Sequence, residues 1–301
     1  THVESYALEF IEPWLLDRPL ALSFKLYSDR RDLTDYDVHR QGGGVGLGIP
    51  AGPAGRVDLR YRIEEIDVSD VADTNLFEYT EDGHDGEVFS FVEPERVASS
   101  LSLQYTLDTR DHPFLATRGG RWYAAGKLMG GPLGCDTDLY NLETGGSLHF
   151  PLWFGHVLSL WARAEVVDSY GDTEQLPITE RLFAGGGQTV RGFRPRWVGP
   201  KARRTDAPEI VRPAGGQTLA VGSVEYEVPL KVLRLSAFYD RGNVWYDPYE
   251  FDLGDVAAGA GLGVLLDIRG FPFRIDYAWP VERDDPRSET KRVSFSLGHR
   301  F

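Results

Sequence analysis

The strongest constraint on this chain of 301 residues is a hydrophobic pattern that repeats every two residues. In SLSLQYTLD (100–108), leucine and tyrosine alternate with serine, glutamine and threonine. In FRIDYAW (273–279), Phe273, Ile275, Tyr277 and Trp279 alternate with smaller or charged residues. Successive side chains of a β-strand point to opposite faces, so this period predicts strands with one apolar and one polar face.

Thirteen segments show the alternation, and most are about ten residues or longer. Strands of soluble proteins are typically about five or six residues long, whereas a strand that crosses a bilayer needs about nine to eleven. The length therefore favours membrane-spanning strands. The segments lie near 2–12, 18–31, 36–49, 56–66, 97–108, 119–130, 138–150, 156–169, 217–228, 232–246, 255–267, 272–280 and 291–301.

The connections between the segments alternate in kind. Short turns rich in proline and apolar residues, such as PAGPAG and PLWFG, follow the odd-numbered segments, and longer polar loops follow the even-numbered ones. Bacterial outer-membrane barrels have this asymmetry, which a soluble β-sandwich or propeller does not explain. We therefore predict an all-β fold, an antiparallel transmembrane β-barrel. The longer loops are 67–96, 131–137, 170–216, 247–254 and 281–290.

Composition excludes several classes of function. The net charge of −14 leaves no excess of cations for a nucleic-acid backbone. A single cysteine, Cys135, rules out an internal disulfide framework. EDGHDGE (81–87) lacks the ligand spacing of an EF-hand, so we expect no metal site, and no motif predicts a cofactor. We also find no serine–histidine pair assigned to one wall, so the sequence predicts a protein that is not an enzyme.

Two strand segments carry a ladder of glycines on one face. They are GGGVGLGI (42–49) and AAGAGLGVLL (257–266), and in each the opposite face is apolar. If the apolar face meets lipid, the glycine face looks into the lumen. Glycine at such positions produces either a bend in the strand or space for a closely approaching backbone, and both interpretations stay open.

The stretch GGGQTVRGF (185–193) lies in the longest loop and is not a P-loop, because no Lys-Ser/Thr pair or helix start follows. If this loop folds inward, Arg191 needs acceptors on the inner wall. Strand parity turns Glu225, Glu227 and Asp240 toward the lumen. A guanidinium can bind one carboxylate with two N–H groups and a second with its remaining donors.

Together, LFAGGGQTVRGF, SVEYEVP, FYDRGNVW and the terminal FSLGHRF resemble the BamA-type superfamily of outer-membrane assembly and translocation proteins over essentially the whole chain. The resemblance implies that the sixth extracellular loop carries the VRGF motif and folds into the lumen, where Arg191 docks on Glu225 and Asp240. The motif comprises Val190, Arg191, Gly192 and Phe193, preceded by Gly185, Gly186 and Gly187.

The same resemblance implies that the terminal segment is a β-signal and one side of a lateral gate, with marked positions at Phe295, Leu297, Gly298 and Phe301. It also implies a barrel of sixteen strands preceded by periplasmic POTRA domains. We therefore expect 1–301 to be a barrel domain with about thirteen of sixteen strands. Two arguments that do not use the resemblance also indicate that strands are missing. The loop asymmetry makes the first strand begin on the outer face, and thirteen antiparallel strands would not close an even-numbered barrel.

The expected function follows from the resemblance. It implies a factor that folds and inserts other β-barrel proteins into the outer membrane of a Gram-negative bacterium through the gate between its first and last strands. The implied partners are unfolded barrel proteins, outer-membrane lipids, and accessory lipoproteins that bind the POTRA domains. The basic run RPRWVGPKARR (194–204) separately suggests contact with lipopolysaccharide phosphates. The alternative is a translocation pore of the same superfamily, as in two-partner secretion, or a TamA-like factor for autotransporters.

Overall fold

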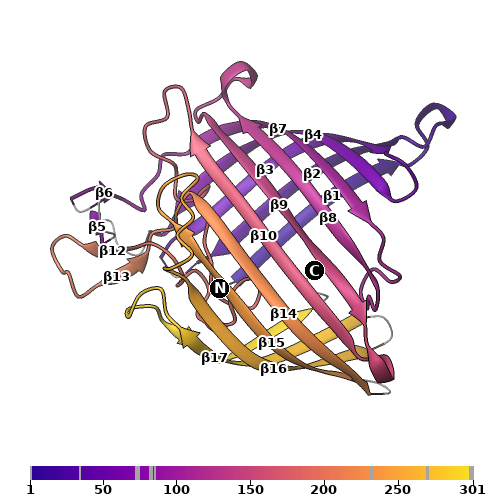
Figure 1. The fold of residues 1–301 in the computed structure, drawn as a ribbon. Helices are drawn as coiled ribbons and strands as arrows, with labels where there is room; N and C mark the ends of the chain where they lie inside the picture. Colours follow the sequence, from indigo (N-terminus) through magenta and orange to yellow (C-terminus); the bar gives the residue numbers. More distant parts are fainter. Residues whose placement is uncertain are drawn as a thin grey trace.

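The main element of the fold is an antiparallel sheet, which has thirteen strands in the described part of the chain and runs in sequence order (Figure 1). The computed structural model describes residues 2–33, 35–71, 75–80, 84, 86–230, 233–268 and 271–297. The strands of the large sheet are β1 (His2–Glu12), β2 (Ala21–Asp32), β3 (Asp37–Pro50), β4 (Gly55–Ser69), β7 (Arg96–Asp108), β8 (Gly119–Met129), β9 (Leu139–Pro151), β10 (Val157–Ser169), β14 (Thr218–Leu230), β15 (Leu233–Trp245), β16 (Ala257–Ile268), β17 (Phe271–Glu282) and β19 (Val293–Leu297).

These strands coincide with the thirteen predicted segments to within a few residues, except at the last one. The pattern predicts a single strand over 291–301, but Lys291 belongs to a separate two-residue strand, β18 (Thr290–Lys291), which pairs with the loop strand β11 (Gly192–Phe193). The last strand of the sheet begins at Val293. Residues 290–291 thus pair with the loop and not with β17, although the period-two alternation alone predicts that the last strand of the sheet already includes Lys291.

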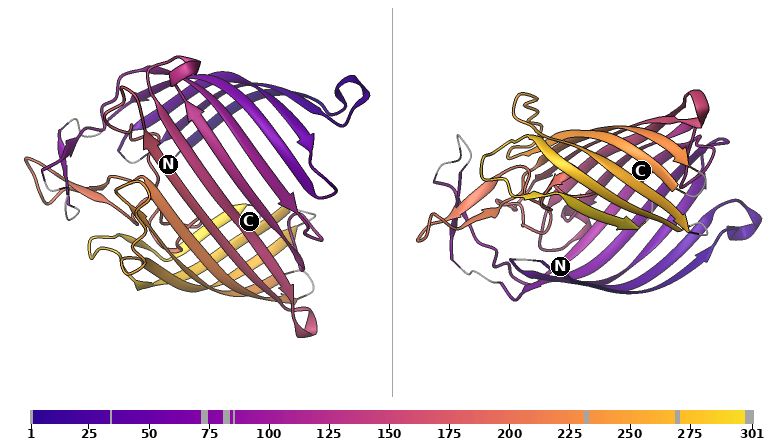
Figure 2. Two further views of the ribbon diagram at one scale, coloured as in Figure 1. Left: turned by 45° about the horizontal axis from the view of Figure 1, so that its top comes forward. Right: turned by 90° about the horizontal axis from the view of Figure 1, so that it is seen from below.

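The sheet curves around an interior, with β1 at one edge and β19 at the other (Figure 2). Each strand pairs with its neighbour in sequence, which is the simplest topology for long strands joined by turns. This arrangement confirms the predicted all-β, antiparallel barrel architecture. Among the described residues, no helix is long and apolar enough to cross a membrane.

The two faces of the sheet differ as the alternation predicts. On β14, the outward Val224 is half-exposed, whereas the inward Glu225 is only 1% exposed. On β15, Leu235 and Tyr239 face outward, and Asp240 is fully buried on the inner side. The apolar side chains therefore cover the outside of the wall, and the polar side chains meet one another inside.

The long loops gather at one end of the sheet and build a second, smaller structure there (Figure 1). Parts of 70–95 and 170–217 form a four-stranded sheet in the order β13 (Val211–Pro213), β12 (Lys201–Arg204), β5 (Phe77–Tyr79) and β6 (Val88–Phe89). The loop asymmetry is weaker than predicted, because the connection 33–36 at this end is short. At the opposite end, the connection 109–118 is long.

The two glycine ladders serve different purposes. An added Cβ on Gly259 of β16 would overlap the carbonyl oxygen of Arg191, so this ladder makes space for the loop backbone. An added Cβ on Gly42 or Gly44 of β3 would instead meet the neighbouring strand β4. Close approach of the inward loop thus explains the second ladder, and close contact between neighbouring strands accompanies the first.

We predict that Leu262→Arg destabilises the protein in a bilayer by about 2–4 kcal/mol, because Leu262 lies on the outer face near the middle of β16. The matched change Leu230→Arg, at the end of β14, should cost only about 0–1 kcal/mol, because the penalty falls near the membrane interface. Reversible folding into lipid bilayers measures both. Equal losses at the two depths would contradict a lipid-facing outer wall.

Candidate functional site

The loop between β10 and β14 enters the interior and buries its VRGF motif there. Val190, Arg191 and Phe193 are each 1% exposed or less. The approach depends on glycines, because Gly185, Gly186 and Gly192 all have positive φ, which L side chains rarely adopt. The Gly186 N–H donates to the Val190 carbonyl oxygen at 3.1 Å, so the glycines form a tight turn that presents Arg191.

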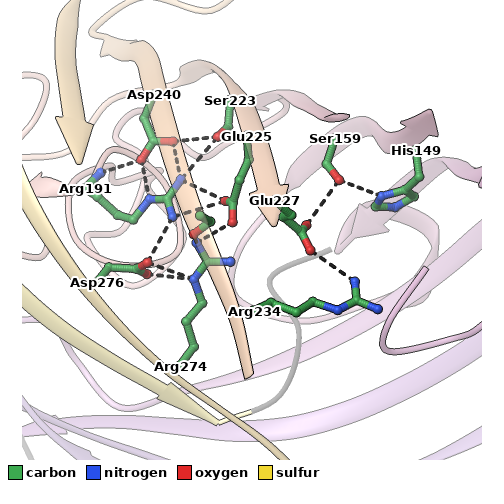
Figure 3. Close-up of polar contacts among 11 residues, drawn as sticks. His149, Ser159, Arg191, Ser223, Glu225, Glu227, Arg234, Asp240, Arg274 and Asp276 are labelled. Atoms are coloured by element: carbon green, nitrogen blue, oxygen red, sulfur yellow. Dashed lines mark hydrogen bonds and ion pairs between the residues drawn. The ribbon is translucent and has the colours of Figure 1, made fainter. Parts of the chain in front are cut away.

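Arg191 makes its strongest contacts with Asp240 on β15 (Figure 3). Its Nε and Nη2 donate to the two carboxylate oxygens at 2.7 and 2.8 Å. Its backbone N–H also donates to Oδ2 of Asp240, at 3.0 Å. Such paired N–H···O bonds fix the orientation of both groups, which a lysine ammonium could not do.

The remaining donors of Arg191 reach the neighbouring strands. Nη1 and Nη2 both lie 3.4 Å from Oε2 of Glu225, and Nη1 lies 3.5 Å from Oδ1 of Asp276. The guanidinium also stacks on Phe238, with its central carbon 3.2 Å from the ring centroid. Arg191 therefore contacts β14, β15 and β17, as Figure 3 shows.

A second arginine, Arg274 of β17, completes the cluster. Its Nη2 lies 2.6 Å from Oε1 of Glu225, and its Nε donates to Asp276 at 2.9 Å. The sequence analysis did not include Arg274 or Asp276 in the site, although the alternation in 273–279 already turns both away from the apolar face. The two arginines and three carboxylates carry a net charge of −1 when all are ionised.

Strand β16 lies between β15 and β17 and contributes glycines to this cluster. An added Cβ on Gly261 would overlap the Phe238 ring. One on Gly263 would overlap a carboxylate oxygen of Asp276. Because the inner face of β16 carries only glycines at these positions, side chains of β15 and β17 can pack directly over it and contact the same cluster.

The loop also contacts the last strands, where the resemblance places the β-signal. Gly192 pairs with Lys291, and an added Cβ on Gly187 would lie 3.4 Å from Ser294 of β19. Phe295 is exposed on the outer face, and Leu297 pairs with Phe273 of β17. The other two predicted positions, Gly298 and Phe301, lie outside the described residues.

A second docking point on the same loop was missed by the sequence analysis. Glu180 is buried among three cations of the opposite part of the wall. It lies 3.1 Å from Arg40 of β3, 3.0 Å from Lys127 of β8 and 3.7 Å from Arg96 of β7. Burial alone would raise the pKa of Glu180, but the three cations outweigh it and lower that pKa to about 2.

The wall also contains a serine–histidine pair, so the prediction that none is present was wrong. Nδ1 of His149 lies 2.9 Å from the Ser159 hydroxyl, and strand parity with the β9–β10 register could have found it. Ser159 donates to Glu227 at 3.3 Å (Figure 3). Nε2 of His149 instead lies 3.2 Å from the Ser147 hydroxyl. The carboxylate therefore contacts the serine and does not orient the imidazole as in a catalytic triad.

The cations of the loop segment 194–204 are used within the protein. Lys201 pairs with Asp284 at 3.1 Å, and Arg203 with Glu78 at 3.2 Å. Arg194 pairs with Glu289 in the segment before β19. Among the residues that the structure describes, no group of three or more potential metal ligands is found, and most of 81–87 lies outside them.

A wall of long amphipathic strands with an arginine-bearing loop fixed inside it defines a class of outer-membrane β-barrel proteins. An Omp85 superfamily domain matches residues 1–301. The chain therefore belongs to the Omp85 superfamily, which confirms the resemblance. Its similarity to bacterial BamA proteins makes it an integral outer-membrane protein of a Gram-negative bacterium.

Curated relatives carry related names. The chain is 24% identical over 99% of its length to "Outer membrane protein assembly factor BamA" of Nitratidesulfovibrio vulgaris, and 23% identical over 98% to the protein of that name from Neisseria meningitidis. It is 28% identical over 68% of its length to a SAM50-like protein of Drosophila melanogaster. The chain spans 36%, 41% and 46% of these three relatives, respectively.

Solved structures share the fold. BamA from Haemophilus ducreyi lacking POTRA domains 1–3 superposes with a TM-score of 0.82 at 20% identity, over 99% of this chain and 62% of that one. CdiB from Acinetobacter baumannii superposes with a TM-score of 0.57 at 13% identity, over 99% of this chain and 50% of that one. The barrel is therefore more similar to the BamA barrel than to the CdiB barrel.

We predict that Arg191→Ala and Asp240→Ala each expose the segment 185–193 to proteases. Removing one partner of a buried ion pair leaves the other unpaired, at a cost of about 3–5 kcal/mol. Arg191→Lys should give a smaller loss, because it keeps the charge without the planar fork. Arg30→Ala is the control, since Arg30 is half-exposed. Protection as in the unmodified protein in both alanine variants would show that this contact does not hold the loop.

We also predict that Glu180→Gln destabilises the loop near neutral pH and that the difference from the unmodified protein narrows in acid. The folded pKa of Glu180, about 2, lies below its ordinary value of 4.5. Its ionisation therefore stabilises the folded state fully above about pH 4.5, and this contribution is lost as the pH falls toward 2. Thermal unfolding across this pH range measures the difference in stability between the variant and the unmodified protein, with Glu174→Gln, an exposed change in the same loop, as control. A difference in stability that does not depend on pH would contradict the lowered pKa of Glu180.

Proposed function

We propose that this chain is the barrel part of a factor that folds other β-barrel proteins and inserts them into the outer membrane. The names of the curated relatives support the proposal, because two are assembly factors that match nearly the whole chain. The observation that carries the mechanism is the position of the last strand, because β19 lies at an edge of the sheet and pairs with β17 alone among the described residues. Its ladder with β17 starts only at Val293, because Thr290 and Lys291 pair with β11 of the loop.

We infer that the last strand is one side of a lateral gate. An edge strand carries a row of N–H and C=O groups that no neighbouring strand pairs with on its outer side, and these groups act as a template. An incoming β-strand can pair with this edge by strand addition. The β-signal positions Phe295, Leu297, Gly298 and Phe301 would belong to this edge.

The role proposed for the VRGF loop is structural. Arg191 would hold β14, β15 and β17 in position, and the pairing of Gly192 with Lys291 would tie the loop to the segment that leads into β19. The ion pair of Lys201 with Asp284 supports the same link. In this proposal the protein is not an enzyme, because Arg191 and Arg274 are engaged with the carboxylates around them and Glu227 contacts the hydroxyl of Ser159, not the imidazole of His149.

The proposed partners follow the same function. Unfolded outer-membrane β-barrel proteins would be the substrates, and lipids of the outer membrane would surround the wall. POTRA domains outside this chain would bind accessory lipoproteins. We further propose that 1–301 is one barrel domain with the lumenal loop 170–216, and that its family barrel has three more strands.

A translocation pore is the second candidate, because CdiB shares the fold. The higher TM-score with BamA favours assembly. In a pore for two-partner secretion we would expect a plug helix upstream of the barrel. A TamA-like factor would differ in its substrates, which would be autotransporters.

We predict that the full-length protein in liposomes accelerates the folding of an unfolded outer-membrane barrel relative to empty liposomes. Heat-modifiable gel mobility follows the folding. Arg191→Ala should slow it, whereas Arg30→Ala should not, because Arg30 lies far along the chain from the loop and is exposed. Export of a soluble partner or steady ion conductance without accelerated folding would instead support the pore.

A further inference from the structure

A long apolar groove crosses the outer face of the wall, on the side formed by β8, β9, β10, β14 and β15. These strands run side by side across the front of Figure 1. The groove has a volume of about 850 Å³, and apolar atoms form most of its surface. It belongs neither to the arginine cluster nor to the gate, and no property of the lumenal loop explains it.

Strand register explains how the groove forms. Gly146, Ala162 and Gly222 lie directly opposite one another on β9, β10 and β14, so three adjacent strands present almost no side chain at the same level. The row ends at Trp122 of β8 and Arg241 of β15, which pair with Gly146 and Gly222. Larger residues lie beside the row and form the walls of the groove, among them Leu148 and Leu160.

The dimensions match a hydrocarbon chain. Five strands at a spacing of about 4.8 Å span on the order of 20 Å. One leaflet contributes about half of a hydrocarbon core that is about 30 Å thick. The outer face of the wall lies in the hydrocarbon core of the bilayer, so an apolar groove on it is filled by lipid hydrocarbon. An extended acyl chain has the required length, shape and chemistry.

The end of the groove at the loop side carries hydrogen-bond donors. Arg241 is 49% exposed at its side chain, and its ion pair with Glu282 is long, at 3.7 Å. Trp245 lines the groove beside it and is only 5% exposed, so its indole ring extends the apolar surface at this end.

The loop 247–256 completes this end. Leu253 and Val256 line the groove, and Asn243 donates to the Asp255 backbone carbonyl at 2.8 Å, which holds the loop against the end of β15. Arg241 lies four residues before the end of β15, where the cost of a lipid-facing cation is small. The apolar lining of the groove suits a hydrocarbon chain, and the guanidinium of Arg241 at one end suits an anionic headgroup.

We propose that this groove binds one acyl chain of an anionic phospholipid, with its phosphate placed against the exposed guanidinium of Arg241. The second chain of the lipid lies in the bulk bilayer. The site rests on the outer-membrane location of the barrel and is independent of the proposed assembly function.

Native mass spectrometry of the full-length protein, titrated with saturated phosphatidylglycerol, tests the site. We expect one tightly bound lipid and at least about tenfold weaker binding of the matching diacylglycerol, since tenfold corresponds to about 1.4 kcal/mol, close to the lower end of what one charge-assisted hydrogen bond contributes. Gly222→Leu should abolish tight binding by filling the groove. The change is compatible with the backbone, because an added Cβ at Gly222 lies 3.5 Å from the Trp161 carbonyl oxygen.

Gly126→Leu is the matched control, because Gly126 faces outward on β8 outside the groove and an added Cβ lies 3.7 Å from Leu142. It should bind lipid as the unmodified protein does. Arg241→Gln should remove the preference for phosphatidylglycerol over diacylglycerol while keeping the chain. Heat-modifiable mobility checks that each variant is folded.

Three results would overturn the proposal. One is binding of phosphatidylglycerol by folded Gly222→Leu with unchanged affinity. Another is a Gly222-dependent dimer without bound lipid, which would assign the groove to a second copy of the chain. The third is tight binding of lipopolysaccharide in place of phosphatidylglycerol, which would assign it to a lipid with several chains.

Discussion

The packing of the barrel interior depends on one buried guanidinium, that of Arg191, which pairs with carboxylates on three strands. Arg191 would be very costly to bury alone, so its stability depends on Asp240, Glu225 and Asp276. In turn, Asp240 depends on Arg191, whereas Glu225 and Asp276 depend on both Arg191 and Arg274. The arrangement is therefore cooperative: the loop cannot leave without exposing uncompensated charge on the wall, and the wall cannot shift without losing the geometry of the fork.

The loop is held by opposite charges at two places. Its cation, Arg191, meets the acidic inner wall of β14, β15 and β17, and its anion, Glu180, meets the basic inner wall of β3, β7 and β8. Each charge would be repelled at the other location. This complementarity fixes the direction in which the loop crosses the interior, and it connects strands that the sheet itself places far apart.

Much of this organisation could be predicted from the sequence, because period-two alternation determines both the strands and the faces of their side chains. The inward positions of Glu225 and Asp240 followed from parity, and family resemblance selected them as partners of Arg191. Parity does not say which inward residues meet across the interior, so Glu180 with its three cations was missed. The pair of His149 with Ser159 lies on adjacent strands and was missed because the β9–β10 register was not worked out. The break before β19 was missed because pairing with Gly192 depends on the loop.

The glycine face of β16 has a consequence for the order of folding. The loop carbonyl of Arg191 occupies the space that a side chain on Gly259 would fill, so β14 to β17 reach their final packing only with the loop inside. Arg191 and Asp276 are far apart in sequence, and contacts of such separation form late because closing the intervening chain costs entropy. Entry of the loop is therefore expected to be a late event, after the hairpins around it have formed.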